Sequence, residues 1–348
     1  MNETLVGLVS QYSPSGQEAA AVRWLVERMK ALGYDQAFID GAGNAVGVMG
    51  SGARQVVLLG HIDTVPGEIP VRVAEGVLHG RGAVDAKGAL ACFVDAAAGA
   101  GAPEGWQVVV IGAVGEERDS RGAYYAAERY RPEYAIIGEP NRWERVALGY
   151  KGTAWAQITT RRGQAHTAGG GKTACEAALE VWGAIRAFAD AYNAGNPRVF
   201  DQVQPTLNHW DAGEGDFEQW ARLKVGVRLP PALPPAAWYD RLEQVAGGVQ
   251  VERLGQSITA WTCDKNTRLV RALLAGIRGA GGSPAFVYKT GTADLNIVAP
   301  VWGCPALVYG PGDSALDHTP DEKIDLGEYG QAVQVLASAL GKLMQAGR

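Results

Sequence analysis

The sequence predicts an α/β protein whose main domain is built on a mostly parallel sheet. Four apolar runs of strand length, at 56–60, 108–115, 135–138 and 306–312, are bounded by Gly or Pro, and the first three are rich in Val and Ile. Such runs are typical of strands that are buried on both faces of a sheet. The Ala-rich stretch 86–100 predicts a buried helix between the first two runs, which gives the strand–helix–strand alternation of βαβ units.

The elements at the N-terminal end follow in order. Ser15 and Glu18 have the spacing of a capping box, so we expect a helix to begin there and to end at Gly33. A strand is expected at about 44–49, and the next strand runs into His61.

A second, smaller domain is predicted from a change of pattern near Tyr150. Residues 153–160 alternate between apolar and polar side chains, as a half-exposed strand does. The elements expected next are a helix at 173–191, a strand at 223–229, a helix at 235–245, and strands at 249–254 and 257–262. We interpret them as an inserted α+β domain of the ferredoxin-like kind at 151–262.

The main domain is therefore expected to be discontinuous, comprising 1–150 and 263–348. After the insertion the pattern returns to a helix at 266–280, strands near 285 and 306, and a final helix at 328–343. A chain of 348 residues is long enough for two such domains.

Composition excludes several classes of protein. The net charge of -5 argues against general nucleic-acid binding, and no apolar stretch is long enough to predict a membrane span. The four cysteines show no CxxC spacing and no signal peptide is recognisable, which fits buried free thiols in a reducing cytoplasm.

Metal-binding side chains follow the predicted strands. Because ligands gather at the carboxyl ends of strands in such sheets, residues at several strand ends point to one metal-centred site. Any one of them alone would fit a solvated strand end, so the inference depends on the joint pattern. The candidates are His61, Asp63, Asp85, Glu116, Glu117, Glu139 and His318. Two His residues and several carboxylates suit a two-metal hydrolytic centre better than Mg²⁺ or Ca²⁺.

Two local patterns suggest a division of labour within this site. Adjacent residues at a strand end point in different directions, so one of Glu116 and Glu117 can bind metal while the other acts as general base. Asp63, two residues after His61, is placed to orient the imidazole.

Three stretches resemble the M20 family of metallopeptidases, and in particular its aminoacylase, acetylornithine deacetylase and succinyl-diaminopimelate desuccinylase group. The first is 60–66 (GHIDTVP) and the second is 80–88 (GRGAVDAKG). The third is 115–122, which contains the pair Glu116-Glu117, together with Gly-Glu-Pro at 138–140. The resemblance covers nearly the whole chain, and it implies a di-metal peptidase domain with an inserted lid and dimerisation domain. Gly115 departs from the family pattern, in which Asp is common.

The resemblance implies a ligand set for two divalent ions, either Zn²⁺ or Co²⁺. His61, Asp85 and Glu139 would hold one ion. Asp85, Glu117 and His318 would hold the other, so that Asp85 bridges the two ions. His79, where an aromatic residue is common, and His209 are expected not to be ligands.

The resemblance also implies roles around the metals. Glu116 would be the general base and Asp63 would orient His61. His166 would reach across the interface of a homodimer to stabilise the oxyanion. Without the resemblance, the sequence would favour an ordinary surface histidine at this position. Arg228 would grip a substrate carboxylate. The loop that contains Gly291 and Thr292 would lie beside the substrate, and Asn208 would lie near the dimer axis.

Stretches 289–296 and 310–314 resemble one branch of the family. Its members release lysine or ornithine from the C-terminal Glu side chain of a small acidic amino-group carrier protein, in lysine and arginine biosynthesis. Basic residues within 118–162 are a candidate landing surface for such a carrier, although acidic residues are interspersed and the charges also fit a solvated face.

Three alternative functions are also compatible with parts of the sequence. The nearest is a deacylase of small molecules such as acetylornithine or succinyl-diaminopimelate. A more distant one is a non-catalytic metal-binding scaffold of the same fold, which the intact Glu116 disfavours. A nucleotide-binding fold is disfavoured because Gly80-Arg81-Gly82 does not continue as a dinucleotide-binding turn.

Overall fold

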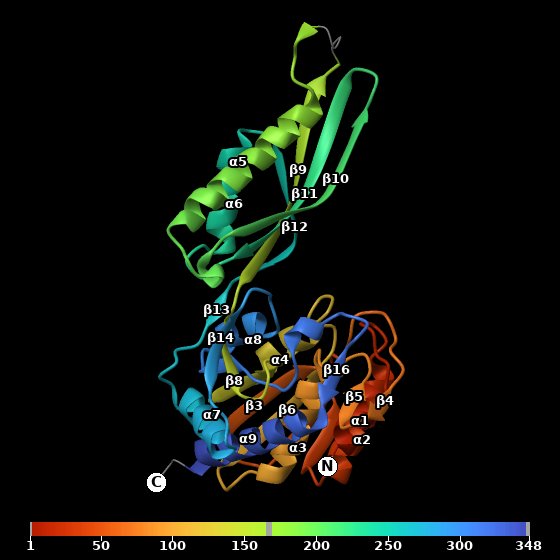
Figure 1. The fold of residues 1–348 in the computed structure, drawn as a ribbon, viewed down its shortest axis with the longest axis vertical. Helices are drawn as coiled ribbons and strands as arrows, with labels where there is room; N and C mark the ends of the chain where they lie inside the picture. The colour runs from red at the N-terminus through yellow and green to blue at the C-terminus, as the bar shows by residue number, and fades with distance from the viewer. Residues whose placement is uncertain (1, 165–168, 346–348) are drawn as a thin grey trace. The chain divides into compact units, whose positions relative to one another are not determined.

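The computed structural model describes residues 2–164 and 169–345, and the chain forms two compact units (Figure 1). The first unit comprises Met1–Gly149, Cys263–Tyr288 and Ala293–Arg348. The second unit comprises Tyr150–Thr262 and Lys289–Thr292.

The first unit contains helices and strands in alternation. Its helices are α1 (Glu3–Val9), α2 (Ala19–Ala31), α3 (Lys87–Ala100), α4 (Arg121–Arg129), α7 (Arg268–Gly279), α8 (Leu295–Trp302) and α9 (Leu326–Gln345). Its strands are β1 (Gln36–Ile39), β2 (Ala45–Met49), β3 (Arg54–His61), β4 (Arg72–Ala74), β5 (Val77–His79), β6 (Trp106–Ala113), β7 (Tyr134–Gly138), β8 (Arg145–Tyr150), β14 (Ala285–Lys289), β15 (Ala306–Val308) and β16 (Lys323–Asp325).

The large sheet of this unit is parallel at its centre. Its strands follow the order β1-β2-β6-β3-β7-β15-β8, and β14 also pairs with β8. The central pairs β6–β3, β3–β7 and β7–β15 are parallel, whereas the outer pairs β1–β2, β2–β6 and β15–β8 are antiparallel. The predicted fold class, an α/β protein with a mostly parallel sheet, is confirmed.

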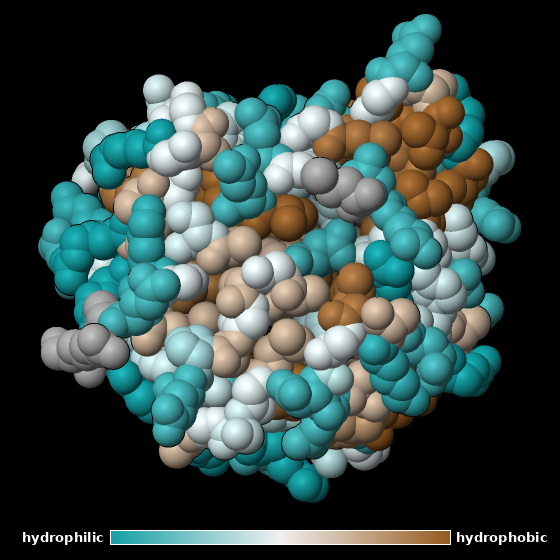
Figure 2. All heavy atoms as spheres, turned by 90° about the horizontal axis from the view of Figure 1, so that it is seen from below, coloured by the Kyte–Doolittle hydropathy of each residue, from teal (hydrophilic) through white to brown (hydrophobic). Residues whose placement is uncertain are grey.

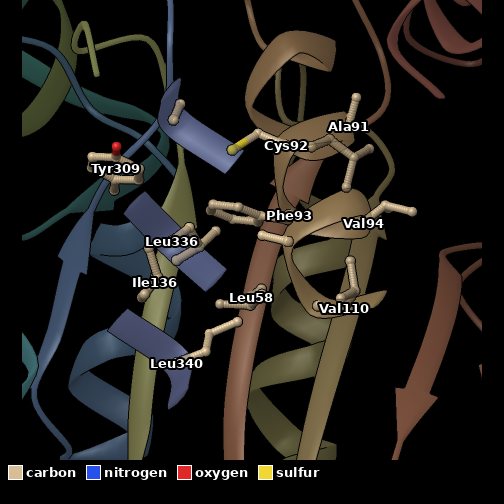
Figure 3. Packing of buried hydrophobic residues seen from close by; sticks show 14 of the residues in the cluster. Leu58, Ala91, Cys92, Phe93, Val94, Val110, Ile136, Tyr309, Leu336 and Leu340 are labelled. Carbon is tan, nitrogen blue, oxygen red and sulfur yellow. The ribbon is translucent and has the colours of Figure 1, made fainter. Parts of the chain in front are cut away.

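Both faces of the central strands are buried. Val56 and Leu58 of β3 lie in a large core cluster with α3 and α9, while Val57 and Leu59 are equally buried on the opposite face. Figure 3 shows Phe93 of α3 packed among Leu58 and other aliphatic side chains. Because the faces of the strands are apolar, their polar chemistry is concentrated at the strand ends.

The second unit is a four-stranded antiparallel sheet with two helices. Its strands are β9 (Gly152–Gly163), β10 (Gln204–Glu214), β11 (Glu218–Leu229) and β12 (Gln250–Ile258), in the sheet order β10-β11-β9-β12. Helices α5 (Ala174–Ala194) and α6 (Pro235–Ala246) share one hydrophobic core with the sheet. The order βαββαβ is that of a ferredoxin-like fold.

One local prediction was wrong, and one strand was missed. Helix α2 begins at Ala19 with no side-chain cap, and the Ser15 hydroxyl donates instead to Asp63, so the predicted capping box is not formed. Strand β10 was not predicted. It is an edge strand of mixed exposure that holds Pro205, Asn208 and Asp211, so it lacks the regular alternation of a half-buried strand.

The surface is mixed in polarity. On the face shown in Figure 2, hydrophilic residues are interspersed with smaller apolar areas, which is common on protein surfaces. None of the helices within 2–164 and 169–345 combines the length and the apolar character that crossing a membrane requires.

Candidate metal centre

The carboxyl ends of three neighbouring strands lie side by side. Gly60 of β3 is paired with Gly112 of β6 on one side and with Gly138 of β7 on the other. His61 and Glu139 are each one residue beyond this row, so they emerge at the same edge of the sheet. A side chain at position 60 would press on helix α3, because a Cβ there would lie 3.3 Å from the Cβ of Leu90.

The turn that carries the Glu pair is held by Asp63. The backbone N–H groups of Glu116 and Glu117 donate to the two carboxylate oxygens of Asp63, at 3.1 and 3.2 Å. The Ser15 hydroxyl donates to the same carboxylate at 2.6 Å. Asp63 is fully buried, so these bonds fix the turn without competition from water. Ser15, which the sequence predicts to cap a helix, instead binds Asp63 at the candidate site.

His61 is oriented mainly by the backbone of Asp63. Its Nδ1 lies 2.9 Å from the Asp63 carbonyl oxygen and 3.7 Å from the nearer carboxylate oxygen. Since a carbonyl can only accept, Nδ1 carries a proton in this contact, and in the neutral ring Nε2 keeps its lone pair for an ion.

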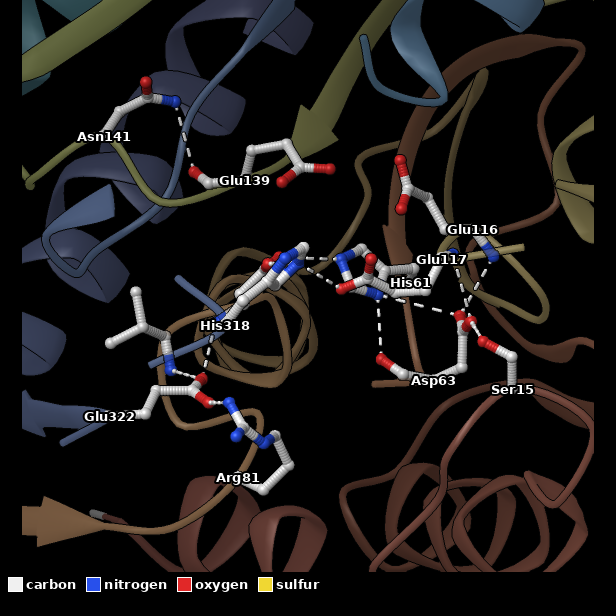
Figure 4. A network of polar contacts seen from close by, with 12 residues as sticks. Ser15, His61, Asp63, Arg81, Glu116, Glu117, Glu139, Asn141, His318 and Glu322 are labelled. Carbon is white, nitrogen blue, oxygen red and sulfur yellow. Dashed lines mark hydrogen bonds and ion pairs between the residues drawn. The ribbon is translucent and has the colours of Figure 1, made fainter. Parts of the chain in front are cut away.

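Asp85 contacts both predicted histidine ligands, His61 and His318, which point toward one another in Figure 4. Its Oδ1 is 3.1 Å from Nε2 of His61, and its Oδ2 is 3.0 Å from Nε2 of His318. His318 also lies 2.9 Å from Oε1 of Glu117. One carboxylate therefore presents one oxygen to each imidazole, which is the geometry of a group that can bridge two ions.

The donor set fits a first-row divalent metal. Ligand atoms of His61, Asp85 and Glu117 all lie within 4.8 Å of one another, and His318 contacts two of these residues. Imidazole nitrogen and carboxylate oxygen together suit Zn²⁺ or Co²⁺. Glu139 is also buried, and it is close enough for the charge of His61 to act on its carboxyl.

The pKa values of these groups are pulled in opposite directions. Burial raises the pKa of Glu116 and of Glu139 well above the usual value for Glu. The pKa of Asp85 is lowered, because its contacts with His318 and His61 outweigh the effect of burial. The hydrogen bond to Asp85 raises the pKa of His318 to about 9, and the charge of Glu117 adds to this. The proton on His318 therefore occupies a position from which an ion would displace it.

Asp294 is a further buried carboxyl near the site. It is 1 % exposed, and burial raises its pKa to about 7, with the charges of His61 and Asp63 and the Ser120 hydroxyl close enough to contribute. The resemblance to the M20 family predicts a substrate loop around Asp294 and no separate role for this residue. Its position between an apolar helix and a Gly/Thr stretch offered no metal-site signal.

The predicted substrate residues lie in the second unit. The Arg228 guanidinium, at the end of β11, donates from Nη1 to the Thr292 hydroxyl at 3.2 Å, and Gly291 is the neighbouring residue in the chain. Burial lowers the pKa of Arg228. Asn208 lies in the edge strand β10. His166 lies outside the described residues.

Several members of the predicted basic surface already have partners. Arg142 pairs with Asp313, and Arg161 pairs with Glu218. Lys151 is fully buried and donates to the carbonyl oxygens of Val199 and Gln202. These contacts reduce the positive charge that the segment can present to a partner.

Comparison with known proteins identifies the family. Residues 57–342 match the Peptidase family M20/M25/M40. The chain is 46% identical over 350 residues to a [LysW]-lysine hydrolase of Deinococcus radiodurans, with 97% of this chain and 95% of that protein covered. It is 38% identical over 342 residues to a putative [LysW]-lysine/[LysW]-ornithine hydrolase of Thermococcus kodakarensis, with coverage of 98% and 91%.

A solved structure shares the fold. The Bacillus subtilis YXEP protein, described as a dinuclear metal-binding peptidase of the M20 family, superimposes with a TM-score of 0.74 at 13% identity. The alignment covers 99% of this chain and 97% of that one. The sequence match and the shared fold agree, and the chain belongs to the peptidase family M20/M25/M40.

Proposed function

We propose that this chain is a metal-dependent amide hydrolase that releases lysine, ornithine or both from the C-terminal Glu side chain of a small acidic carrier protein. The observation that carries the chemistry is the sharing of Asp85 between His61 and His318, with the Glu pair beside them. The substrate is supported by two relatives, 46% and 38% identical over most of the chain, which are described as hydrolases of [LysW]-lysine and of [LysW]-lysine or [LysW]-ornithine.

The ligand assignment follows from the donor set. His61, Asp85 and Glu139 would hold one divalent ion, and Asp85, Glu117 and His318 the other. When bound, two Zn²⁺ or Co²⁺ ions supply Lewis-acid polarisation of an amide carbonyl and lower the pKa of water. The chain's own residues provide the remaining functions.

Glu116 is proposed as the general base. Its backbone N–H is bound by Asp63, which fixes the point from which its side chain extends at the candidate site. Burial raises its pKa well above the usual value for Glu, and a carboxylate with a raised pKa is a stronger base than an ordinary one. It would take a proton from water and deliver it to the leaving α-amino group.

Arg228, with Thr292 and Gly291, is proposed to bind the carboxylate of the amino acid that is released. A guanidinium matches the fork of a carboxylate, and Thr292 already holds Arg228 in place.

The second unit is proposed to act as a lid and dimerisation domain. Its edge strand β10 carries unpaired backbone groups along one side, which a second copy could extend. In such a homodimer His166 would stabilise the oxyanion of the partner's site.

A mixing experiment tests this arrangement. Glu116→Ala and His166→Ala are each expected to be inactive, and a mixture of the two is expected to recover up to about a quarter of the parent activity, because hybrid dimers contain one intact composite site. No recovery after subunit exchange, which mass spectrometry would verify, would place both residues in one subunit's site.

The four free cysteines support placing the protein in a reducing compartment, and we propose the cytoplasm.

The substrate is tested by direct comparison. Purified carrier protein bearing lysine or ornithine, acetylornithine and succinyl-diaminopimelate would each be incubated with the enzyme, and the products measured by mass spectrometry. The proposal expects release from the carrier conjugates at least about 100-fold more efficiently than from the free acyl compounds. Preference for a free acyl compound would identify a small-molecule deacylase instead.

A further inference from the structure

Glu322 is a buried carboxylate that none of the ligand assignments includes. It is 1 % exposed, four residues after His318 and directly before β16. Strand β16 pairs antiparallel with β5, and the backbone carbonyl of Glu322 accepts from Gly80 at 3.3 Å. The carboxylate therefore extends from a fixed piece of backbone.

Both oxygens of Glu322 are engaged. Oε1 accepts the backbone N–H groups of Val84 and Asp85, each at 2.9 Å, and Oε2 accepts from Nη1 of Arg81 at 2.9 Å (Figure 4). Arg81 is itself 7% exposed and donates from Nε to the carbonyl oxygen of Gly67 at 2.9 Å. The negative charge is thus balanced by a buried guanidinium.

The hydrogen bonds of Glu322 fix the backbone of Asp85, the residue that is proposed to contact both ions. The N–H of Asp85 is attached to the Cα from which the shared carboxylate extends, so anchoring this peptide restricts where that carboxylate can lie. Its two oxygens must stay within reach of His61 and His318 together, and such sites tolerate errors of only about 0.5 Å.

One loop therefore performs two tasks. It contributes His318, and four residues later it contributes the carboxylate that holds Asp85. A carboxylate that only attached this loop to the neighbouring sheet would need no hydrogen bond to the backbone of Asp85, a proposed metal ligand. The charge of Glu322 is also neutralised by Arg81, so it adds an acceptor without adding net charge near the ligands.

We propose that Glu322 is a positioning residue that sets the spacing of Asp85 and His318 for the shared ion. This inference rests on the proposed metal-dependent function and adds a residue to it. Arg81 serves as the counter-charge that allows the carboxylate to be buried.

The test must separate positioning from stability, since breaking a buried ion pair can unfold a protein. Two double variants remove both charges: Arg81→Met with Glu322→Gln, and Arg81→Met with Glu322→Met. Only the Gln variant keeps an oxygen that can accept from Val84 and Asp85. Glu328→Met is the control, because Glu328 likewise accepts two backbone N–H groups, from Trp143 and Gly312, and contacts no ligand.

Ion binding is followed by calorimetry and by the visible absorption of Co²⁺, and folding by the thermal midpoint of the metal-free proteins. We expect the Met double variant to bind Co²⁺ about ten- to hundredfold more weakly than the Gln double variant, and with an altered absorption spectrum. The Glu328→Met control should bind Co²⁺ as the parent does. Equal affinities and spectra in the two double variants, with or without a change in midpoint, would overturn the positioning role. A parent chain that binds no divalent ion would instead refute the proposed function.

Discussion

The two units differ in where polar side chains lie along their strands. In the first unit, strands buried on both faces leave polar groups only at their ends, where His61, Asp85 and Glu117 converge. In the second, helices share a core with one face of an antiparallel sheet, and polar residues alternate along the strands. Arg222 of β11, for example, lies over the Trp220 ring and 3.7 Å from Asp211.

This difference determines how much about the reaction can be inferred from each unit. Groups gathered at one buried edge perturb one another's pKa and form a reactive set. Groups spread over an exposed sheet interact pairwise and weakly with solvent between them. The first unit therefore indicates the type of reaction, whereas the proposed substrate contacts of the second unit involve a few residues that resemble their neighbours.

The largest expected effect is the loss of activity on substitution of Glu116, which lies beyond the end of β6. Glu116→Gln keeps the size of the side chain and removes the base, so kcat should fall by about 10²- to 10⁴-fold while both ions remain bound. Kinetics with metal analysis on the same sample measure this. Glu133→Gln is the control, because Glu133 pairs with Arg54 and contacts no ligand. Activity of Glu116→Gln within tenfold of the parent would rule out the base.

Ion affinity should increase with pH. An ion must displace the proton of His318, whose pKa is raised to about 9, so affinity should rise by about tenfold per pH unit up to that value. The stability of the metal-free protein should show the opposite trend. The contribution of His318 to the free energy of unfolding is fully present below pH 6.5 and is lost as the pH rises through about 9. Titration calorimetry in buffers of different ionisation heats counts the protons released. In His318→Gln the slope should be shallower, and an unchanged slope would exclude His318 as the titrating group.

A substitution in the second unit should affect binding rather than chemistry. Arg228→Met removes the proposed carboxylate contact, so KM should rise by about ten- to hundredfold while kcat changes little. Arg222→Met in the same strand is the matched control, since Arg222 pairs with Asp211 and lies over the Trp220 ring, both in strands of the same sheet. A fall in kcat with unchanged KM would give Arg228 a role in the reaction and blur the contrast between the units.

The smallest effect is expected at Ser15. Ser15→Ala removes one of the three donors to Asp63 and leaves the two backbone donors in place. A single hydrogen bond to a charged group contributes about 1.5–3 kcal/mol at most, so turnover should drop by roughly tenfold. Steady-state rates of Ser15→Ala and Ser15→Thr would show it. Equal loss in both variants would mean that the hydroxyl is not the relevant group.

Much of the fold could be predicted because burial leaves a strong pattern. Runs such as 56–60 and 108–115 identify parallel strands, and their ends indicate where His61 and Glu116 emerge. Residues within β10 gave no such signal, since an exposed edge strand is not constrained to alternate.

The supporting residues of the site were harder to predict. Ser15 fits a capping box locally, and only the tertiary contact with Asp63 reveals its use. Glu322 contacts Val84 and Asp85 from more than two hundred positions away in the sequence. Side chains that act through a backbone N–H leave no spacing rule, because the group they bind is present at almost every residue.

The most direct test is the release of amino acid from a carrier conjugate under metal control. Purified enzyme, stripped of metal, would be incubated with lysine-bearing carrier protein, and free lysine measured before and after addition of Zn²⁺ or Co²⁺. We predict negligible release without metal, rapid release after its addition, and release at least about 100-fold slower by Glu116→Gln with the same metal. Release that is independent of metal, or that survives loss of Glu116, would contradict hydrolysis at the strand-end site.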